Sequence, residues 1–366
     1  MPRFSTFRDF DWVLLGFVLL LSIISVFEIK SATAHTKFHG FDSKQIEFLL
    51  VGICLMFLIS LIDYHRLLDL ATPAYIISIA SLVAVKLVGT KVLGGQRWIN
   101  LGGGIHFQPS EWVKLVLILV VARYFWNLSG KRLSWKDIGK AFALVGVPML
   151  FVLKQPDLGT ALTYLPILLC GLFLGGLRLK QASILLLAFV LVGAIGWSTG
   201  KMLKPYQKAR LTSFLDPDSD PRGSGYQIRQ SLIAVGSGGI WGKGANKGTQ
   251  TQGDFLPIPY TDFIFAAFCE EHGFVGAIGI LVLYFLILMR LVQNAQTASD
   301  LPGSFLIMGI VAVILFQIAV NIGMVLGLMP VTGIPLPLMS YGGSSILFTF
   351  LALGIVMNIR MRRFVN

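Results

Sequence analysis

The chain has 366 residues, of which 55% are hydrophobic and only 13% are charged. Because soluble domains carry about a quarter charged residues, this composition excludes a water-soluble fold. The net charge of +12 does not indicate a nucleic-acid partner, since the lysines and arginines lie in loops between apolar segments and no recognition motif surrounds them. Positive loops beside anionic lipid headgroups account for the charge.

Apolar stretches recur along the whole chain, and each is long enough to cross a hydrocarbon core of roughly 30 Å as a helix. The stretches are continuous rather than alternating, which favours helices over strands. They predict an all-α, polytopic membrane protein with about ten transmembrane helices that form a single domain over residues 1–366. The predicted spans are residues 11–29, 46–62, 70–88, 110–127, 138–154, 158–176, 179–198, 263–290, 303–328 and 342–360.

One connection, about residues 199–262, is a long hydrophilic loop, so the orientation is predicted from the lysines and arginines of the short loops. With the N-terminus inside, fourteen of these residues fall on the cytoplasmic side and seven on the opposite side. This distribution predicts that both termini are cytoplasmic and that the long loop is extracytoplasmic.

The fourth span begins with the sequence QPSEWVK, in which Glu111 and Lys114 are three residues apart. This spacing places both side chains on one face of a helix, near its outer end, where they can pair. One interpretation is an ion pair, or a snorkelling lysine, that lets charge enter the membrane edge. The other is a polar cavity wall that orders a substrate or a cation.

Two further polar positions lie at the predicted outer face. Asp157 follows Gln155-Pro156 in a short turn, and it either caps the next helix or contacts a ligand. Arg97 and Arg210 lie beside aromatic or span-proximal residues in extracytoplasmic loops. Arginine binds phosphate oxygens with fork-like hydrogen bonds, so these two cations are candidates for gripping a pyrophosphate, although a basic loop on anionic headgroups has the same composition.

Asp262 stands immediately before the apolar run of the eighth span. Burial at the membrane boundary raises the pKa of a carboxylate toward that of a usable base. A helix N-cap, or a first-turn acid favoured by the helix dipole, is the alternative. Glu270 and Glu271 follow two turns later, at a depth where a carboxylate needs a partner or water.

Familiar nucleotide and metal motifs are excluded. In the glycine-rich GSGGIWGKGANKG, a G-x-G-x-x-G register from Gly242 has Lys247 in its third glycine position, and Lys243 is followed by Gly244 instead of Ser or Thr. The five histidines show no metal-ligand spacing, and the three cysteines lie singly in apolar segments. The sequence therefore predicts no nucleotide site, zinc site or disulfide framework.

Several segments together resemble the SEDS family (shape, elongation, division and sporulation) of integral-membrane peptidoglycan glycosyltransferases, over nearly the whole chain. The resemblance rests on GGQRWINLGGGIHFQPSEWVKL, KQPDLGTAL, DPDSDPRGSGYQIRQSLIAVGSGGIWGKG, TDFIFAAFCEEHGFVG and PVTGIPLPLMSYGGSS. Within the family, GKGANKGTQTQGDFLP and GIPLPLMSYGGSS favour the elongation branch over the division branch. One departure is Ile258, where family members usually have glutamate, whereas Thr261-Asp262-Phe263 is intact.

The resemblance implies that lipid II, an undecaprenyl-linked disaccharide-pentapeptide, is polymerised on the outer face of the bacterial cytoplasmic membrane, with Asp262 as the catalytic base. The base takes the proton of the acceptor's GlcNAc 4-hydroxyl, that oxygen attacks the anomeric carbon of the donor's MurNAc with inversion, and undecaprenyl pyrophosphate leaves. The resemblance also places Glu111 and Lys114 near the working cavity.

The charge of the leaving group must be offset, and arginine or lysine or a divalent cation such as Mg²⁺ or Mn²⁺ would do so. No organic cofactor is implied. The implied partners are a class B penicillin-binding protein, which crosslinks the new glycan, and other membrane proteins of the elongation complex.

Two rival functions come from other classes. A transporter that flips lipid II would also use many helices with intramembrane charges, but no inverted repeat is visible in the sequence. A non-catalytic membrane scaffold for the penicillin-binding protein would explain the hydrophobicity but not the outer-face carboxylates and cations.

Overall fold

The ten predicted spans are helical in the computed structural model, which describes residues 9–34, 36, 38, 40–92, 95–100, 106–199 and 205–363. The first five are α1 (Trp12–Thr33), α2 (Phe41–Leu61), α4 (Ala71–Val88), α5 (Pro109–Asn127) and α6 (Trp135–Lys154). The sixth is divided into α7 (Leu158–Leu162) and α8 (Leu165–Leu174). The rest are α9 (Leu179–Thr199), α13 (Ile264–Gln296), α14 (Leu301–Val325) and α15 (Gly343–Met361).

Seven of these helices are long and apolar enough to cross a membrane by length and composition within the described residues. The other three spans deviate for visible reasons. α5 carries Glu111, Lys114 and Arg123, α6 has charged residues near both ends, and α7 with α8 is interrupted before Pro166. The predicted all-α, polytopic membrane fold is confirmed.

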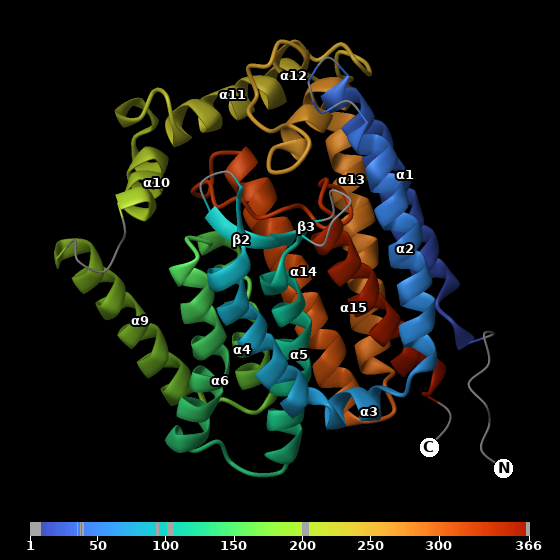
Figure 1. The fold of residues 1–366 in the computed structure, drawn as a ribbon, viewed down its shortest axis with the longest axis vertical. Helices are drawn as coiled ribbons and strands as arrows, with labels where there is room; N and C mark the ends of the chain where they lie inside the picture. The colour runs from blue at the N-terminus through green and yellow to red at the C-terminus, as the bar shows by residue number, and fades with distance from the viewer. Residues whose placement is uncertain are drawn as a thin grey trace.

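Both ends of the described chain lie at one end of the helix bundle (Figure 1). Asp9 and Arg363 approach to 3.9 Å there, and His65 of α3 (Tyr64–Asp69) contacts Asp300 at 2.8 Å. The opposite end carries a small sheet and the helices of the long loop (Figure 1). With an even number of spans, both termini must lie on the same side of the membrane. The candidate site residues lie at the opposite, loop-bearing end.

The centre of the bundle is formed by α14 and α15, whereas α9 stands apart from it (Figure 1). In the most apolar stretch of α15, 83% of residues are buried, against 11% in α9. Close helix packing explains the difference, because a β-carbon on Gly354 of α15 would lie 2.7 Å from the Met56 carbonyl oxygen of α2. Small residues allow such backbone approach between membrane helices.

The glycine-rich stretch before α5 contains a three-stranded antiparallel sheet, which the sequence did not predict. Its strands are β1 (Thr90–Val92), β2 (Gly95–Asn100) and β3 (His106–Phe107). Residues 93–94 and 101–105 of this stretch lie outside the described residues. The strands are too short to show a period of two, which is why only irregular backbone was expected.

The long loop also contains helices. They are α10 (Pro205–Leu215), a 3₁₀ turn at Pro217–Ser219, α11 (Ser224–Ser237) and α12 (Thr249–Gln252). They form a layer across the loop-bearing end (Figure 1). Lys201 and Lys204, which belong to the same basic loop, lie outside the described residues.

α13 is broken at Gly273, whose φ of 65° is left-handed. The backbone of the glycine-rich segment 238–244 packs against this break, with hydrogen bonds from the Lys243 amide to the Glu270 carbonyl and from the Phe274 amide to the Gly239 carbonyl. A β-carbon on Gly242 would lie 2.1 Å from the Glu271 carbonyl oxygen. These glycines therefore allow close backbone packing.

Candidate active site

Five segments that are distant in sequence converge at the loop-bearing end. β2 carries Arg97, the turn before α7 carries Asp157, α10 carries Arg210, and the turn before α13 carries Asp262. The fifth segment, residues 330–342, connects α14 to α15 and lies among them. Asp262 interacts electrostatically with Arg210, Asp157 and Arg97, so the structure brings these four predicted residues together.

The position of Asp262 is fixed through backbone atoms. Asn321 of α14 donates from Nδ2 to the carbonyl oxygens of Asp262 and Ile334, at 3.0 and 2.8 Å. Ser340 donates from its hydroxyl to the Thr261 carbonyl at 2.7 Å. The turn is therefore held without using the carboxylate.

The carboxylate of Asp262 accepts no hydrogen bond from the described residues, and it does not cap α13. The N-cap position of that helix is Phe263, which makes no side-chain capping bond. The interpretation of Asp262 as a helix cap is wrong, because the helix begins two residues after the aspartate, at Ile264. The lone pairs of the carboxylate remain available to a substrate.

The surroundings of Asp262 change the pKa of its carboxyl group. The side chain is half-buried, and burial raises the pKa of Asp262 to about 6. Arg210 and Arg97 oppose this rise, while the negative charge of Asp157 adds to it. A carboxylate with a pKa near 6 is ionised at neutral pH and still basic enough to take a proton from a reacting hydroxyl.

Arg210 faces Asp262 across the 330–342 segment. Its Nη1 donates to the Thr332 carbonyl at 3.0 Å, and a β-carbon on the following residue, Gly333, would lie 3.4 Å from Oδ2 of Asp262. Burial lowers the pKa of Arg210, but a guanidinium stays protonated at any physiological pH. Since this is its one hydrogen bond to described residues, most of its donors remain for a ligand.

Asp157 is buried and satisfied by several partners. Oδ1 accepts from the Thr160 amide at 3.2 Å, so the predicted N-cap role is confirmed. Oδ2 accepts from Gln108 Nε2 at 3.0 Å, and Oδ1 lies 3.7 Å from Nη1 of Arg97. Arg97 also donates to the carbonyls of Gln155 and Pro156. Asp157 therefore holds a helix start and orients Arg97.

Glu111 and Lys114 form the predicted pair, with Nζ 2.7 Å from Oε2. The exposed fraction is 4% for Glu111 and 0% for Lys114, so the pair is buried. Nζ of Lys114 also lies 4.3 Å from the ring centre of Phe348 on α15. The pair thus ties α5 to α15, and a role in substrate binding stays a prediction.

Glu270 has a structural role. Its carboxylate accepts hydrogen bonds from Lys243 Nζ at 2.7 Å, the Gln250 amide at 2.8 Å, and both the amide and the hydroxyl of Thr251 at 3.1 and 2.9 Å. These bonds hold α12 and the loop before it against α13. Glu271 points elsewhere, toward α1, where its Oε1 accepts from the Ser31 hydroxyl at 2.5 Å.

The sequence analysis did not predict a role for three residues that position the site, namely Asn321, Ser340 and Gln108. Asn321 carried a signal, because a buried amide in an apolar span is costly and therefore usually functional. Ser340 and Gln108 act on backbone and side chains far away in the chain, and no local pattern marks them.

A divalent cation at the reaction centre would have the interacting carboxylates of Asp262 and Asp157 beside it, and Mg²⁺ is usually held by one or two carboxylates together with substrate phosphates. The described residues bring no third carboxylate, histidine or cysteine into ligating distance of Asp262 and Asp157, and they contain a single metal-compatible group, which lies elsewhere. The cations that do face Asp262 are Arg97 and Arg210. A metal ion at the leaving group stays a prediction of the resemblance.

The fold and the site define a polytopic membrane protein in which a carboxylate without hydrogen bonds from the described residues interacts electrostatically with two arginines. Residues 8–364 match the FtsW, RodA and SpoVE family, described as cell cycle proteins. Peptidoglycan glycosyltransferase MrdB of Escherichia coli strain K12 is 40% identical, over 99% of this chain and 97% of MrdB. The crystal structure of Thermus thermophilus rod shape determining protein RodA is similar with a TM-score of 0.72 and 30% identity, over 97% of this chain and 98% of RodA.

A chain in the structure of a peptidoglycan synthase complex that coordinates polymerization and crosslinking has a TM-score of 0.84 and 33% identity, over 97% of this chain and 98% of its own length. The protein therefore belongs to the FtsW/RodA/SpoVE family, the SEDS family. The resemblance inferred from the five motifs is confirmed.

Proposed function

We propose that this protein is a peptidoglycan glycosyltransferase that polymerises lipid II into glycan strands. The observation that carries the proposal is the carboxylate of Asp262, which is half-buried, free of hydrogen bonds from the described residues and flanked by Arg97 and Arg210. Family membership supports the chemistry, because the relative MrdB of Escherichia coli is a peptidoglycan glycosyltransferase.

In the proposed reaction, Asp262 takes the proton from the 4-hydroxyl of the acceptor's GlcNAc. The oxygen then attacks the anomeric carbon of the donor's MurNAc from the face opposite the leaving group, so the α-linked donor gives a β-linkage. The bond to the pyrophosphate oxygen breaks, and undecaprenyl pyrophosphate leaves. General-base catalysis of this kind contributes about 10²–10⁴-fold to a rate.

Arg97 and Arg210 offset the charge of the departing pyrophosphate. Each guanidinium carries five N–H donors in a planar fork that matches phosphate oxygens. Both are anchored through carbonyl groups, at Gln155 and Thr332 respectively, so their orientation is set before the substrate arrives. Such preorganised donors stabilise charge that develops in a transition state.

The experiment that tests the proposal compares two aspartate variants of the purified protein, assayed with lipid II and a cognate class B penicillin-binding protein. Asp262→Asn keeps the shape and removes the base, so polymer formation should fall at least about 10²-fold. Asp254→Asn is the matched control, because Asp254 is exposed in the same loop and asparagine tolerates its left-handed φ of 55°.

Near-normal polymerisation by the Asp262→Asn variant would contradict the proposal. So would movement of lipid II across sealed vesicles by the wild type without polymer, which would favour the transporter.

We further propose that the protein acts in cell elongation and shape maintenance, with a class B penicillin-binding protein and other elongation-complex membrane proteins as partners. The similarity to rod shape determining RodA and to a chain of a synthase complex supports this assignment. Depletion in a rod-shaped host should produce round cells, and filaments would indicate a division role instead.

The proposed orientation in the bacterial cytoplasmic membrane has both termini in the cytoplasm and residues 199–262 outside. Exposed serines at the two ends of the bundle, Ser219 and Ser129, allow a matched test in a background without Cys54, Cys170 and Cys269. An impermeant thiol reagent should label Ser219→Cys in intact spheroplasts and Ser129→Cys only after the membrane is opened. Labelling of Ser129→Cys in intact spheroplasts, and of Ser219→Cys only after opening, would show that the topology is the opposite one.

A further inference from the structure

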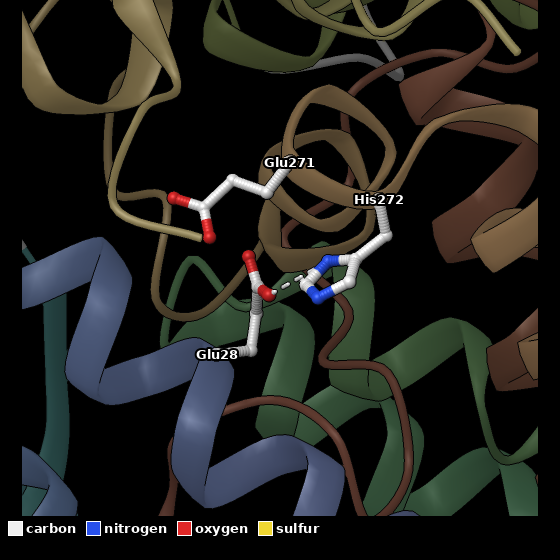
Figure 2. Close-up of side chains that lie close together, drawn as sticks. All are labelled: Glu28, Glu271 and His272. Carbon is white, nitrogen blue, oxygen red and sulfur yellow. Dashed lines mark ion pairs between the residues drawn. The ribbon is translucent and has the colours of Figure 1, made fainter. Parts of the chain in front are cut away.

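Three metal-ligating side chains meet where the last turns of α1 approach α13 (Figure 2). Glu28 comes from α1, while Glu271 and His272 come from α13, immediately before the break at Gly273. Their ligating atoms lie within 4.8 Å of one another, and Nδ1 of His272 is 3.6 Å from Oε2 of Glu28. Figure 2 shows the Glu28 carboxylate between the Glu271 carboxylate and the imidazole.

The carboxylates of Glu28 and Glu271 are buried and accept few hydrogen bonds from the described residues. Glu28 is 2% exposed and Glu271 is 1% exposed. Among the residues that the structure describes, neither oxygen of Glu28 has a hydrogen-bond partner, and neither does Oε2 of Glu271. Glu270, the adjacent residue, is fully bonded by contrast. Two buried carboxylates that face each other without donors are costly, and a bound cation would supply the missing partner for both.

We propose that Glu28, Glu271 and His272 bind one divalent transition-metal ion, for which Zn²⁺ is the best match. Imidazole nitrogen with carboxylate oxygen suits zinc, whereas Mg²⁺ and Ca²⁺ prefer oxygen alone. Tetrahedral bonds of about 2.0–2.2 Å place ligand atoms roughly 3.3 Å apart, so the present separations need only small side-chain rotations to close. The two carboxylates also balance the ionic charge.

The surroundings complete the site. Oε1 of Glu271 is oriented by the Ser31 hydroxyl at 2.5 Å and by Gln252 Nε2 at 3.5 Å, as outer-shell groups orient ligands at metal centres. The side chain of His272 is 41% exposed, so the group is open on one side and has room for a water as the fourth ligand. The three protein ligands and one water would satisfy zinc.

A metal ion here would fasten α1 to α13 close to the reaction centre without belonging to it. Glu271 follows Asp262 by nine residues on the same stretch of chain. Ser31 also binds the loop before α12, through the Asn246 amide at 3.1 Å, and its carbonyl accepts from Gln252. The proposed ion would link α1, α12 and α13, and it is distinct from a cation at the pyrophosphate.

The test is a titration of the full-length, chelator-stripped protein in detergent with Zn²⁺ alone. The wild type should bind about one zinc per chain and melt at a higher temperature with zinc, since binding to the folded state stabilises it. Glu28→Gln and His272→Gln should each weaken zinc binding at least tenfold and abolish the thermal shift. His106→Gln, at an exposed histidine on the same end of the bundle, should retain both.

Three results would overturn the proposal. The first is a wild type that holds no stoichiometric zinc, and the second is retention of wild-type zinc affinity by both Glu28→Gln and His272→Gln. The third is equal occupancy and stabilisation by Mg²⁺ at the same concentration, which would exclude a transition-metal site. Because Glu28→Gln removes a buried, unbonded charge, this variant should still fold, and its metal binding can be measured directly.

Discussion

Asp262 lies just before α13 and Glu270 lies eight residues later, within the helix, yet their carboxylates have opposite surroundings. Glu270 accepts hydrogen bonds from four residues, Lys243, Thr249, Gln250 and Thr251. The side chain of Asp262 accepts none from the described part of the chain, although two arginines face it. A saturated carboxylate holds a loop in place, whereas a free one can accept a proton from a substrate.

Glu111 belongs with Glu270 in this comparison, because its charge is matched by Lys114. Glu271 and Glu28 differ from both kinds, since they are buried, and among the described residues Glu271 is only partly hydrogen-bonded and Glu28 is not hydrogen-bonded. Substitution should therefore affect paired and free carboxylates differently. Removing a paired carboxylate, or its partner, should cost stability, and removing the free one should cost activity alone.

The largest effect is expected at Lys114. Lys114→Met should lower the free energy of unfolding by about 3–5 kcal/mol, because it leaves the buried charge of Glu111 without a partner. The double variant Glu111→Gln/Lys114→Met should lose less than the sum of the single variants, and exchanging the two residues should recover part of the loss. Unfolding in detergent is measured for the wild type, both single variants, the double variant and the exchanged variant, and strictly additive losses would argue against pairing.

Glu270 should show a smaller loss of stability. Glu270→Gln keeps one acceptor oxygen and replaces the other by an amide group, so the free energy of unfolding should fall by about 1.5–3 kcal/mol, the contribution of one charge-assisted hydrogen bond. The matched control is Glu47→Gln, an exposed position on α2, for which the change should stay within about 0.5 kcal/mol. Equal melting temperatures for the two variants would show that the hydrogen bonds of Glu270 do not stabilise the fold.

Asp262→Asn should behave in the opposite way and raise stability at neutral pH. Burial raises the pKa of Asp262 from 3.8 to about 6, so the folded state holds this proton more tightly than the unfolded chain does. Its contribution to stability is therefore full below about pH 3.8 and is lost as the pH rises through about 6. The asparagine variant should melt higher than the wild type above pH 6, with the difference vanishing toward pH 4.

A lower melting temperature of the asparagine variant at pH 7.5 would indicate that Asp262 carries a structural bond.

The sequence predicted the parts of this protein that depend on local pattern. Continuous apolar runs located all ten spans, the i, i+3 spacing predicted the pair of Glu111 and Lys114, and the turn at Gln155-Pro156 predicted the cap at Asp157. These features arise within one helix or at its end. The short strands before α5 were missed because they have too few residues to show alternation.

Features that depend on tertiary packing could not be predicted. Asn321 supports Asp262 from 59 residues away, and Glu28 meets Glu271 only because α1 packs against α13. The cap interpretation of Asp262 failed for a backbone reason. Residues 259–263 form turns, so the helix begins only at Ile264, and Ile258 before these turns has a φ of 49°, which is unusual for a β-branched residue.

The most direct test of the central claim is the pH dependence of kcat/KM for lipid II polymerisation. With Asp262 as the base, the wild-type value should be low below pH 5, rise with an inflection near pH 6 and level off above pH 7, because only the ionised carboxylate can accept the proton. The small residual activity of Asp262→Asn should show no such inflection. An unchanged inflection in the asparagine variant would show that another group is the base.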